Sequence, residues 1–157
     1  MEESRVRVLV VDDHEPFRRF VCTTLAEEQD VEVIGEASDG LSAIRKAEEL
    51  KPDLIVLDIG LPTLNGIEAG RRIRKLCPEC KILFLTQESS VEMVQEAFSL
   101  GASAYIVKAH AGSELSAAVE AVCQGRLFVS KGLSDHNRTD ASGAQAPGYF
   151  RRKFSRR

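Results

Sequence analysis

The chain has 157 residues, of which 43% are hydrophobic and 29% are charged, values typical of a single globular domain. This composition excludes a disordered chain, a collagen-like chain and a disulfide scaffold, and no apolar run reaches the roughly 18 residues of a membrane span. The net charge of −3 is unevenly distributed, because residues 131–157 carry seven basic and two acidic residues whereas residues 1–130 carry 14 and 22.

The N-terminal sequence MEESRVRVLVVDD begins with acidic residues and lacks the small-residue cleavage site of a signal peptide. We therefore expect a cytoplasmic protein. In that compartment thiols are kept reduced, so the four cysteines are expected to be free.

Five short apolar runs predict strands. In chain order they are Val6–Val11, the more exposed Val31–Ala37, Leu54–Leu57, Ile82–Leu85 and Ala104–Val107. Continuous apolar runs of this length are typical of strands that are covered on both faces, as in parallel sheets.

A helical pattern with a one-sided apolar face follows each of these runs. The patterns lie over Phe17–Leu25, Leu41–Leu50, Ile67–Cys77, Val91–Gly101 and Leu115–Val122, and no further pattern follows Ser130. Five strand–helix pairs in about 125 residues predict an α/β fold, in which helices cover both faces of a parallel sheet.

Polar side chains stand at the C-terminal ends of four of the predicted strands. Such ends meet at one edge of a parallel sheet, which is where open α/β sheets bind ligands. The residues delivered there are Asp12, Asp13, Asp58, Thr86 and Lys108. One aspartate after a strand is often only a turn or cap residue, but four polar strand ends together favour a functional site.

Three neighbouring carboxylates repel one another unless a cation neutralises them, and ligands that are all oxygen favour Mg²⁺. Mg²⁺, a lysine and a hydroxyl group are the parts that bind the oxygens of a phosphoryl group. One carboxylate can then act as the nucleophile. Asp58 stands alone at its strand end, whereas the pair Asp12 and Asp13 suits metal binding.

The segments VLVVDDHEPFR, PDLIVLDIGLPTLNGIEA, ILFLT and GASAYIVK resemble, in order and spacing, the receiver domain of bacterial two-component response regulators. The resemblance covers about residues 5–128. It implies a flavodoxin-like fold with a five-stranded parallel sheet of order 2-1-3-4-5 and helices on both faces. It also implies a phosphoacceptor signalling domain that catalyses only its own phosphorylation and dephosphorylation, and is otherwise not an enzyme.

The resemblance implies a role for each matching residue at the acidic end of the sheet. Asp58 matches the phosphoacceptor, which takes its phosphoryl group from a sensor histidine kinase. Asp13 matches the direct Mg²⁺ ligand, and Asp12 matches the second acid, which often acts through water. The backbone carbonyl of Gly60 matches the third protein ligand of the metal.

The resemblance also implies a switch. Thr86 matches the hydroxyl that moves onto the phosphoryl group, and Lys108 matches the lysine that pairs with it. Tyr105 matches the aromatic residue whose ring then turns inward. The surface expected to change, roughly residues 88–124, would serve partner binding or homodimerisation.

Two positions depart from the family pattern. Ala109 stands where a proline in a cis bond usually follows the lysine, so we expect a trans and more mobile loop over residues 108–112. Gly60 has no side chain that could shield the attacking water, and Glu88 could contact that water instead.

The segment GLPTLNGIEAGRRI resembles the subfamily that usually carries a C-terminal helix-turn-helix domain, yet residues 131–157 show no pair of helical patterns. Residues 129–157 are therefore expected to form a basic, flexible tail. Its end, YFRRKFSRR, interleaves aromatic and basic residues. This suits nucleic acid or an acidic protein surface, but a merely solubilising end is favoured, and docking onto the acidic body is a third alternative.

Three further motifs are open to a functional reading. Cys77 and Cys80 form a C-x-x-C, for which a simple turn is favoured over a redox or zinc site. His14 follows the acidic pair and is expected to be exposed rather than a ligand, because the site is rich in oxygen. No role is expected for His110 or His136.

Two alternative functions remain besides the phosphorylated receiver. One is a DNA-associated regulator that acts through the tail, and the other is a receiver-like adaptor that is never phosphorylated. A flavodoxin-like binder of FMN is disfavoured, because DDHE follows the first strand where a phosphate loop rich in Gly, Ser and Thr would be needed.

Overall fold

The structure is a computed structural model, and it describes residues 5–87 and 89–133. Glu88, His136 and the basic end of the tail therefore lie outside the described residues. Within the described part of the chain, no helix is both long and apolar enough to cross a membrane.

The strands form one parallel sheet of order β2-β1-β3-β4-β5-β6. Its strands are β1 (Val6–Val11), β2 (Val31–Ala37), β3 (Leu54–Leu57), β4 (Lys81–Thr86), β5 (Ala104–Val107) and β6 (Phe128–Val129). Four of the five predicted strands have the predicted bounds, and β4 is longer than Ile82–Leu85 by one residue at each end.

The predicted order of the first five strands is confirmed, but the expectation of a five-stranded sheet needs correction. The short strand β6 pairs with β5, so that Ala104 lies opposite Phe128 and Tyr105 lies opposite Val129. A strand of two residues is too short to show an alternating or continuous apolar pattern. The expected boundary between the receiver domain and the tail, after residue 128, falls within β6 and stays a prediction.

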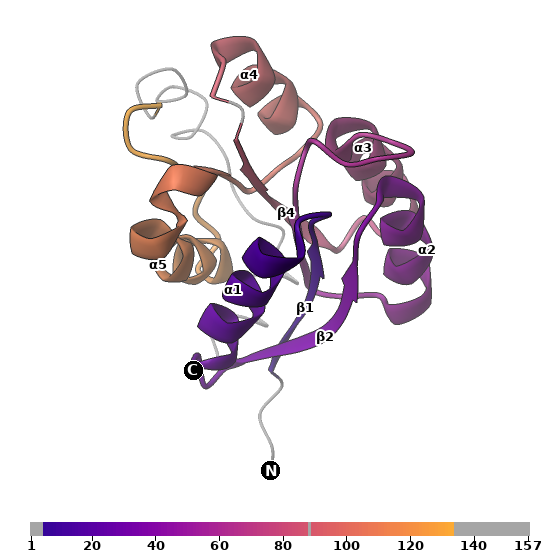
Figure 1. Cartoon of the computed structure of the whole chain (residues 1–157), viewed down its shortest axis with the longest axis horizontal. Coiled ribbons are helices and arrows are strands. Elements are labelled where there is room, and N and C mark those ends of the chain that lie inside the picture. The colour runs from indigo at the N-terminus through magenta and orange to yellow at the C-terminus, as the bar shows by residue number, and fades with distance from the viewer. Residues whose placement is uncertain (1–4, 88, 134–157) are drawn as a thin grey trace.

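Helices cover both faces of the sheet, as predicted (Figure 1). They are α1 (Glu15–Ala26), α2 (Gly40–Leu50), α3 (Gly66–Leu76), α4 (Val91–Ser99) and α5 (Ala111–Cys123), and the 3₁₀ helix η1 (Lys108–His110) directly precedes α5. Helices α1 and α5 contribute to one apolar cluster, and α2, α3 and α4 contribute to the other.

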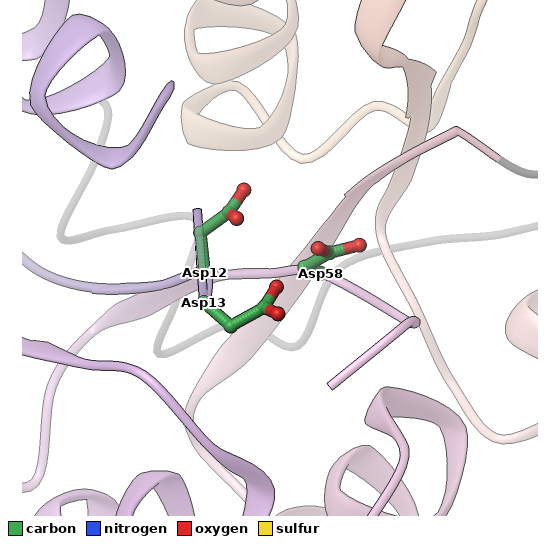
Figure 2. Close-up of side chains that lie close together, drawn as sticks. All are labelled: Asp12, Asp13 and Asp58. Atoms are coloured by element: carbon green, nitrogen blue, oxygen red, sulfur yellow. The ribbon is translucent and has the colours of Figure 1, made fainter. Parts of the chain in front are cut away.

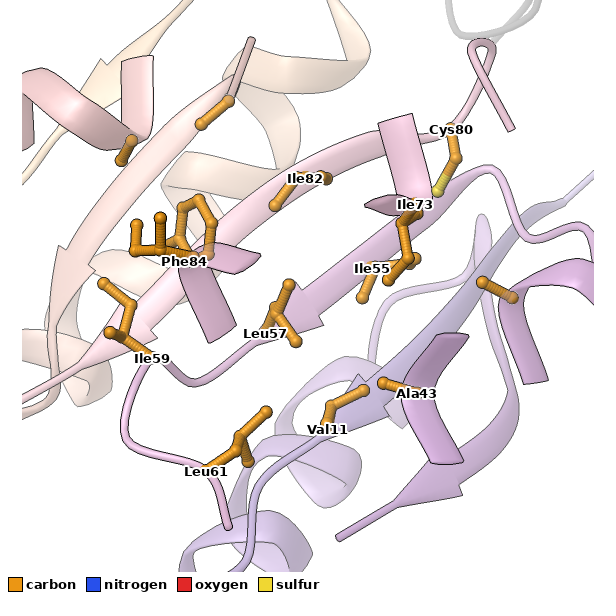
Figure 3. Close-up of a cluster of buried hydrophobic side chains, with 14 of the residues drawn as sticks. Val11, Ala43, Ile55, Leu57, Ile59, Leu61, Ile73, Cys80, Ile82 and Phe84 are labelled. Carbon is orange, nitrogen blue, oxygen red and sulfur yellow. The ribbon is translucent and has the colours of Figure 1, made fainter. Parts of the chain in front are cut away.

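Alternation along the strands creates these two clusters. In β1, Val8 and Val10 face the cluster beneath α1 and α5, whereas Leu9 and Val11 face the opposite one. Figure 3 shows the second cluster, in which Leu57 and Phe84 come from neighbouring strands. Since β1, β3, β4 and most of β5 are buried on both faces, their carboxyl ends are held rigidly.

Candidate functional site

Three carboxylates lie together at the carboxyl edge of the sheet. Strands β1 and β3 are neighbours, and Val11 pairs with Leu57. Asp12 and Asp13 follow the first of these strands and Asp58 follows the second. One oxygen of each lies within 4.8 Å of the others, and the side chains are close in space (Figure 2). The predicted acidic cluster is therefore present, with Asp12 and Asp58 buried and Asp13 exposed.

Hydrogen bonds from the following loop and helix hold Asp12. The backbone N–H of His14 donates to Asp12 Oδ1 over 2.9 Å. Arg18, in the first turns of α1, donates to the backbone carbonyl of Asp12 over 2.7 Å and forms an ion pair with Glu36 on β2. The start of α1 is thereby tied to the ends of β1 and β2, which holds Asp12 in place.

Lys108 lies against both buried carboxylates. Its Nζ is 2.8 Å from Asp12 Oδ2 and 3.2 Å from Asp58 Oδ2, and its side chain is only 13% exposed. The residue follows β5, two strands away from β3 in the sheet. The structure thus brings Lys108 together with two members of the acidic cluster.

Burial and charge oppose each other at this contact. Loss of solvent raises the pKa of Asp58 above its usual value, Lys108 works against that rise, and the Asp12 carboxylate adds to it. For Lys108, burial disfavours the cation, but the hydrogen bonds and charges of Asp12 and Asp58 outweigh burial and raise its pKa. The lysine is thus firmly cationic beside a carboxylate that is costly to ionise.

Thr86 and Gly60 complete the predicted group around Asp58. Thr86 ends β4, is buried, and pairs with Val107, the residue before Lys108. The N–H of Gly60 donates to Asp58 Oδ1 over 3.2 Å. Asp13, Asp58, Gly60, Thr86 and Lys108 line one cavity of about 710 Å³, so the side chains of four strand ends meet around one space.

Tyr105 lies apart from that cavity, within β5. Its side chain is fully buried, and its ring centroid is 6.5 Å from that of Phe84. The ring therefore already points inward in this structure, and the rotation implied by the resemblance stays a prediction.

The site suits a small hard cation. Among the described residues, Asp12, Asp13 and Asp58 are the group of acidic, histidine or cysteine side chains placed to hold a metal ion. Their ligand atoms are all oxygens, the donor set that Mg²⁺ prefers. His14 is exposed and is not part of this group, although it lines the same cavity.

The segment after Lys108 differs from the expected loop. Residues Lys108–His110 form the short helix η1, which leads directly into α5. No peptide bond in the described ranges is cis, so the bond before Ala109 is trans, as expected. The exposed His110 is the residue before α5, and no hydrogen bond from its side chain caps that helix.

The C-x-x-C motif forms the turn between α3 and β4. The N–H of Cys80 donates to the carbonyl of Cys77 over 3.0 Å, and both side chains are buried. Burial raises the pKa of both thiols, which disfavours the thiolate that redox chemistry or zinc binding needs. These features support the turn interpretation.

Sequence reasoning missed two contributions to the site and its surroundings. The ring of Phe17 lies beneath the ammonium of Lys108, at 4.7 Å from Nζ to the ring centroid. Ser130, which is fully buried, accepts a hydrogen bond from the N–H of Val107 and donates one to Glu114. Phe17 carried no separate signal, because its spacing marked it as part of the apolar face of a helix.

Comparison of the chain with known proteins agrees with this geometry. The model of the response regulator receiver domain family matches residues 8–120. The response regulator protein VraR of Staphylococcus epidermidis is 38% identical over 120 residues, which are 76% of this chain and 57% of that protein. The chain thus spans little more than half the length of that curated relative.

Solved structures of response regulators are also similar. A LuxR-family two-component response regulator from Aurantimonas sp. SI85-9A1 has a TM-score of 0.81 and 33% identity, covering 87% of this chain and 98% of that one. The response regulator domain of Thermotoga maritima CheB has a TM-score of 0.64 and 40% identity, covering 68% of this chain and 80% of that one. Residues 8–120 include every residue of the acidic site, and the chain belongs to the response regulator receiver family.

Proposed function

We propose that this receiver accepts a phosphoryl group on Asp58 and loses it again by hydrolysis. The observation that carries the proposal is the contact of Lys108 with Asp58 inside a cluster of three carboxylates. A buried ion pair of this kind is costly to maintain. Its placement at the ligand-binding edge of the sheet favours a chemical role over a purely structural one.

The positions of these groups support such a transfer. An oxygen of Asp58 attacks phosphorus, the bond from phosphorus to the donor breaks, and the donor leaves with its electron pair. From a phosphohistidine, the leaving group is the imidazole nitrogen, which then takes up a proton. Lys108 favours the ionised carboxylate that must attack, and can then bind a phosphoryl oxygen. In the later hydrolysis, water attacks phosphorus, the bond from phosphorus to the Asp58 oxygen breaks, and phosphate and the free carboxylate are released.

Asp12, Asp13 and Asp58 are the side chains that would hold Mg²⁺, together with the backbone carbonyl of Gly60. The ion would neutralise the carboxylates and the oxygens of the transferred group. The chain's own contribution is to hold Asp12 through His14 and Arg18, and to keep Lys108 against both Asp12 and Asp58.

The phosphoryl group would bias the region around Thr86 and Tyr105. Both side chains are buried on neighbouring strands, and in a close-packed interior a shift of either has to be accommodated by the side chains around it. We propose that the surface formed by α4, β5 and α5 carries this change to a protein partner or a second copy of the chain. A sensor histidine kinase in the cytoplasm would be the donor.

Intact mass measurement tests the central step. The protein is incubated with phosphoramidate and Mg²⁺, and the expected result is a gain of one phosphoryl mass. The gain should disappear in Asp58→Asn and when a chelator replaces Mg²⁺. Asp53→Asn is the matched control, because Asp53 is a buried aspartate at the other end of β3 that accepts from the N–H of Arg7.

A parent protein that gains no mass would contradict the proposal and leave an adaptor that works without phosphorylation. Nucleic-acid binding through the basic tail stays a prediction, because residues 134–157 lie outside the described part of the chain. A steep fall of DNA affinity with salt would support it.

A further inference from the structure

Three groups surround the ammonium of Lys108. Two are the carboxylates of Asp12 and Asp58, and the third is the ring of Phe17, whose centroid is 4.7 Å from Nζ. A cation within about 6 Å of a ring centroid is attracted by the negative face of the ring. Phe17 also lines the cavity that contains Asp58 and Thr86, so the ring belongs to the wall of the site.

The fold holds the ring in this position. Phe17 is the third residue of α1, and Pro16 stands in the first turn of that helix. The next residue, Arg18, is bonded to the carbonyl of Asp12. One turn further on, the ring of Phe20 packs against that of Phe17, with centroids 5.5 Å apart. The ring of Phe17 is therefore held by its contact with Phe20 and by the hydrogen bond that ties the neighbouring Arg18 to Asp12.

The ring of Phe17 stabilises the ammonium of Lys108 in a way that another carboxylate could not. The ring attracts the cation without taking one of its three N–H donors, so two can contact Asp12 and Asp58 and one remains available. The ring also keeps water from that side of an ammonium whose side chain is 13% exposed. When an oxygen of Asp58 becomes bonded to phosphorus, the contact of Lys108 with Asp58 has to change, whereas its contact with Phe17 can persist.

We infer that Phe17 is a positioning residue for phosphorylation, which holds the Lys108 ammonium beside Asp58 by a cation–π contact. The inference rests on the proposed function, because Lys108 would otherwise have no phosphoryl oxygen to meet. Phe17 is not a nucleophile and touches no reacting atom. What matters is the electron density on the face of the ring, and not only its volume.

Fluorinated phenylalanines separate these two properties, since fluorine withdraws density from the ring face with little change in size. At position 17, we expect the rate constant for phosphorylation by phosphoramidate to fall stepwise from phenylalanine through 4-fluoro- to 3,4,5-trifluorophenylalanine. Phe17→Leu should lower it about fivefold, which corresponds to about 1 kcal/mol. Phe17→Trp should retain most of the rate. The same fluorinated series at Phe20, which contacts Phe17 but not Lys108, should leave the rate unchanged.

A second measurement reports the contact without any phosphorylation. The ¹⁹F resonance of 4-fluorophenylalanine at position 17 should shift when Lys108 is changed to methionine, and the same label at position 20 should shift much less. Unfolding by urea is measured for each fluorinated protein, and equal stabilities would exclude a general packing defect as the cause of the rate effect.

The outcomes separate the two proposals. If the parent protein takes up no phosphoryl group, the proposed function fails, and the rate effect at Phe17 fails with it. If the parent is phosphorylated but fluorination at position 17 has no effect on the rate, only the role of Phe17 is overturned. A dependence on fluorination that is equally steep at position 20, or that persists in Lys108→Met, would overturn it as well.

Discussion

Lys108 and Asp58 are 50 positions apart in the chain, yet the ammonium of one lies 3.2 Å from a carboxylate oxygen of the other. The same ammonium is even closer to Asp12, at 2.8 Å. In both of these ion pairs the two side chains are largely buried. The cation therefore stabilises a cluster that would otherwise consist of mutually repelling acids.

Replacing Lys108 with a neutral side chain should show how far the mutually repelling carboxylates lower the free energy of unfolding. We expect Lys108→Met to lower the free energy of unfolding by about 2 kcal/mol in the presence of a chelator, because two buried carboxylates lose their partner. Mg²⁺ should restore part of the loss by mass action. Urea unfolding with chelator and with Mg²⁺ measures both effects. Equal stability of parent and variant in chelator would show that the pair does not stabilise the fold.

Gly66 and Gly60 provide a matched pair of substitutions beside Asp58. A Cβ at Gly66 would lie 2.0 Å from the backbone carbonyl oxygen of Asp58, whereas a Cβ at Gly60 would meet nothing within 4 Å. Gly66→Ala should therefore destabilise the protein by about 3 kcal/mol or more and slow phosphorylation, because α3 must move away from the β3 end. Gly60→Ala should change the free energy of unfolding by less than about 1 kcal/mol. Similar losses in both would contradict this steric account.

Lys81 should make the free energy of unfolding depend on pH in the alkaline range. Burial, and then the nearby Arg74 cation, lower the pKa of Lys81 from 10.5 to about 8. Between these pH values the unfolded chain binds more protons at this residue than the folded chain does. The contribution of Lys81 to stability therefore rises with pH through this interval and is unfavourable below it.

We accordingly expect Lys81→Met to be more stable than the parent at neutral pH, by about 1 kcal/mol after allowance for the partial exposure of the side chain. This difference should shrink as pH rises from 8 to 10.5. Urea unfolding of both proteins across that range gives the difference directly. The exposed Lys75→Met is the control, and a constant advantage of Lys81→Met at all pH values would contradict the prediction.

Ser130 should stabilise the segment that follows α5. Its hydroxyl accepts from the N–H of Val107 over 3.0 Å and donates to Glu114, while its own N–H donates to the carbonyl of Tyr105 over 2.9 Å. Ser130→Ala would leave the partly buried N–H of Val107 without its acceptor, which should cost about 1–2 kcal/mol. Hydrogen exchange at Val107 should accelerate.

Ser116 is the control for that experiment, because its hydroxyl also donates to a glutamate, Glu28, but at an exposed position. Ser116→Ala should change stability by less than about 0.5 kcal/mol. Equal effects of the two alanine variants would show that the buried hydroxyl of Ser130 contributes no more than an exposed one.

The strands and the acidic site could be predicted because both follow from local patterns. Continuous apolar runs identified β1 and β3 to the residue, and parallel strands bring their carboxyl ends to one edge. Asp12, Asp58 and Lys108 come directly after such runs, so the sequence alone placed them together. Their roles in phosphorylation remain predictions.

The contacts that sequence reasoning missed depend on the exact direction of a side chain or on very short elements. Phe17 shares the spacing of the apolar face of α1, so its position over Lys108 could not be distinguished from ordinary packing. Ser130 is polar and follows the last helical pattern, which is typical of a loop. Its burial comes from partners in β5 and α5 that no local pattern connects with it.

The sixth strand changes what the β5 side of the sheet can offer to another polypeptide. The backbone of β5 is hydrogen-bonded to β4 on one side and to β6 on the other, so within the described residues β6 replaces β5 as the edge of the sheet on this side. The strand β6 has only two residues, and so short an edge is a poor template for intermolecular pairing. We therefore expect a protein that docks on this side to be recognised mainly through side-chain shape and charge, because the longer β2 edge is the better template for extending the sheet.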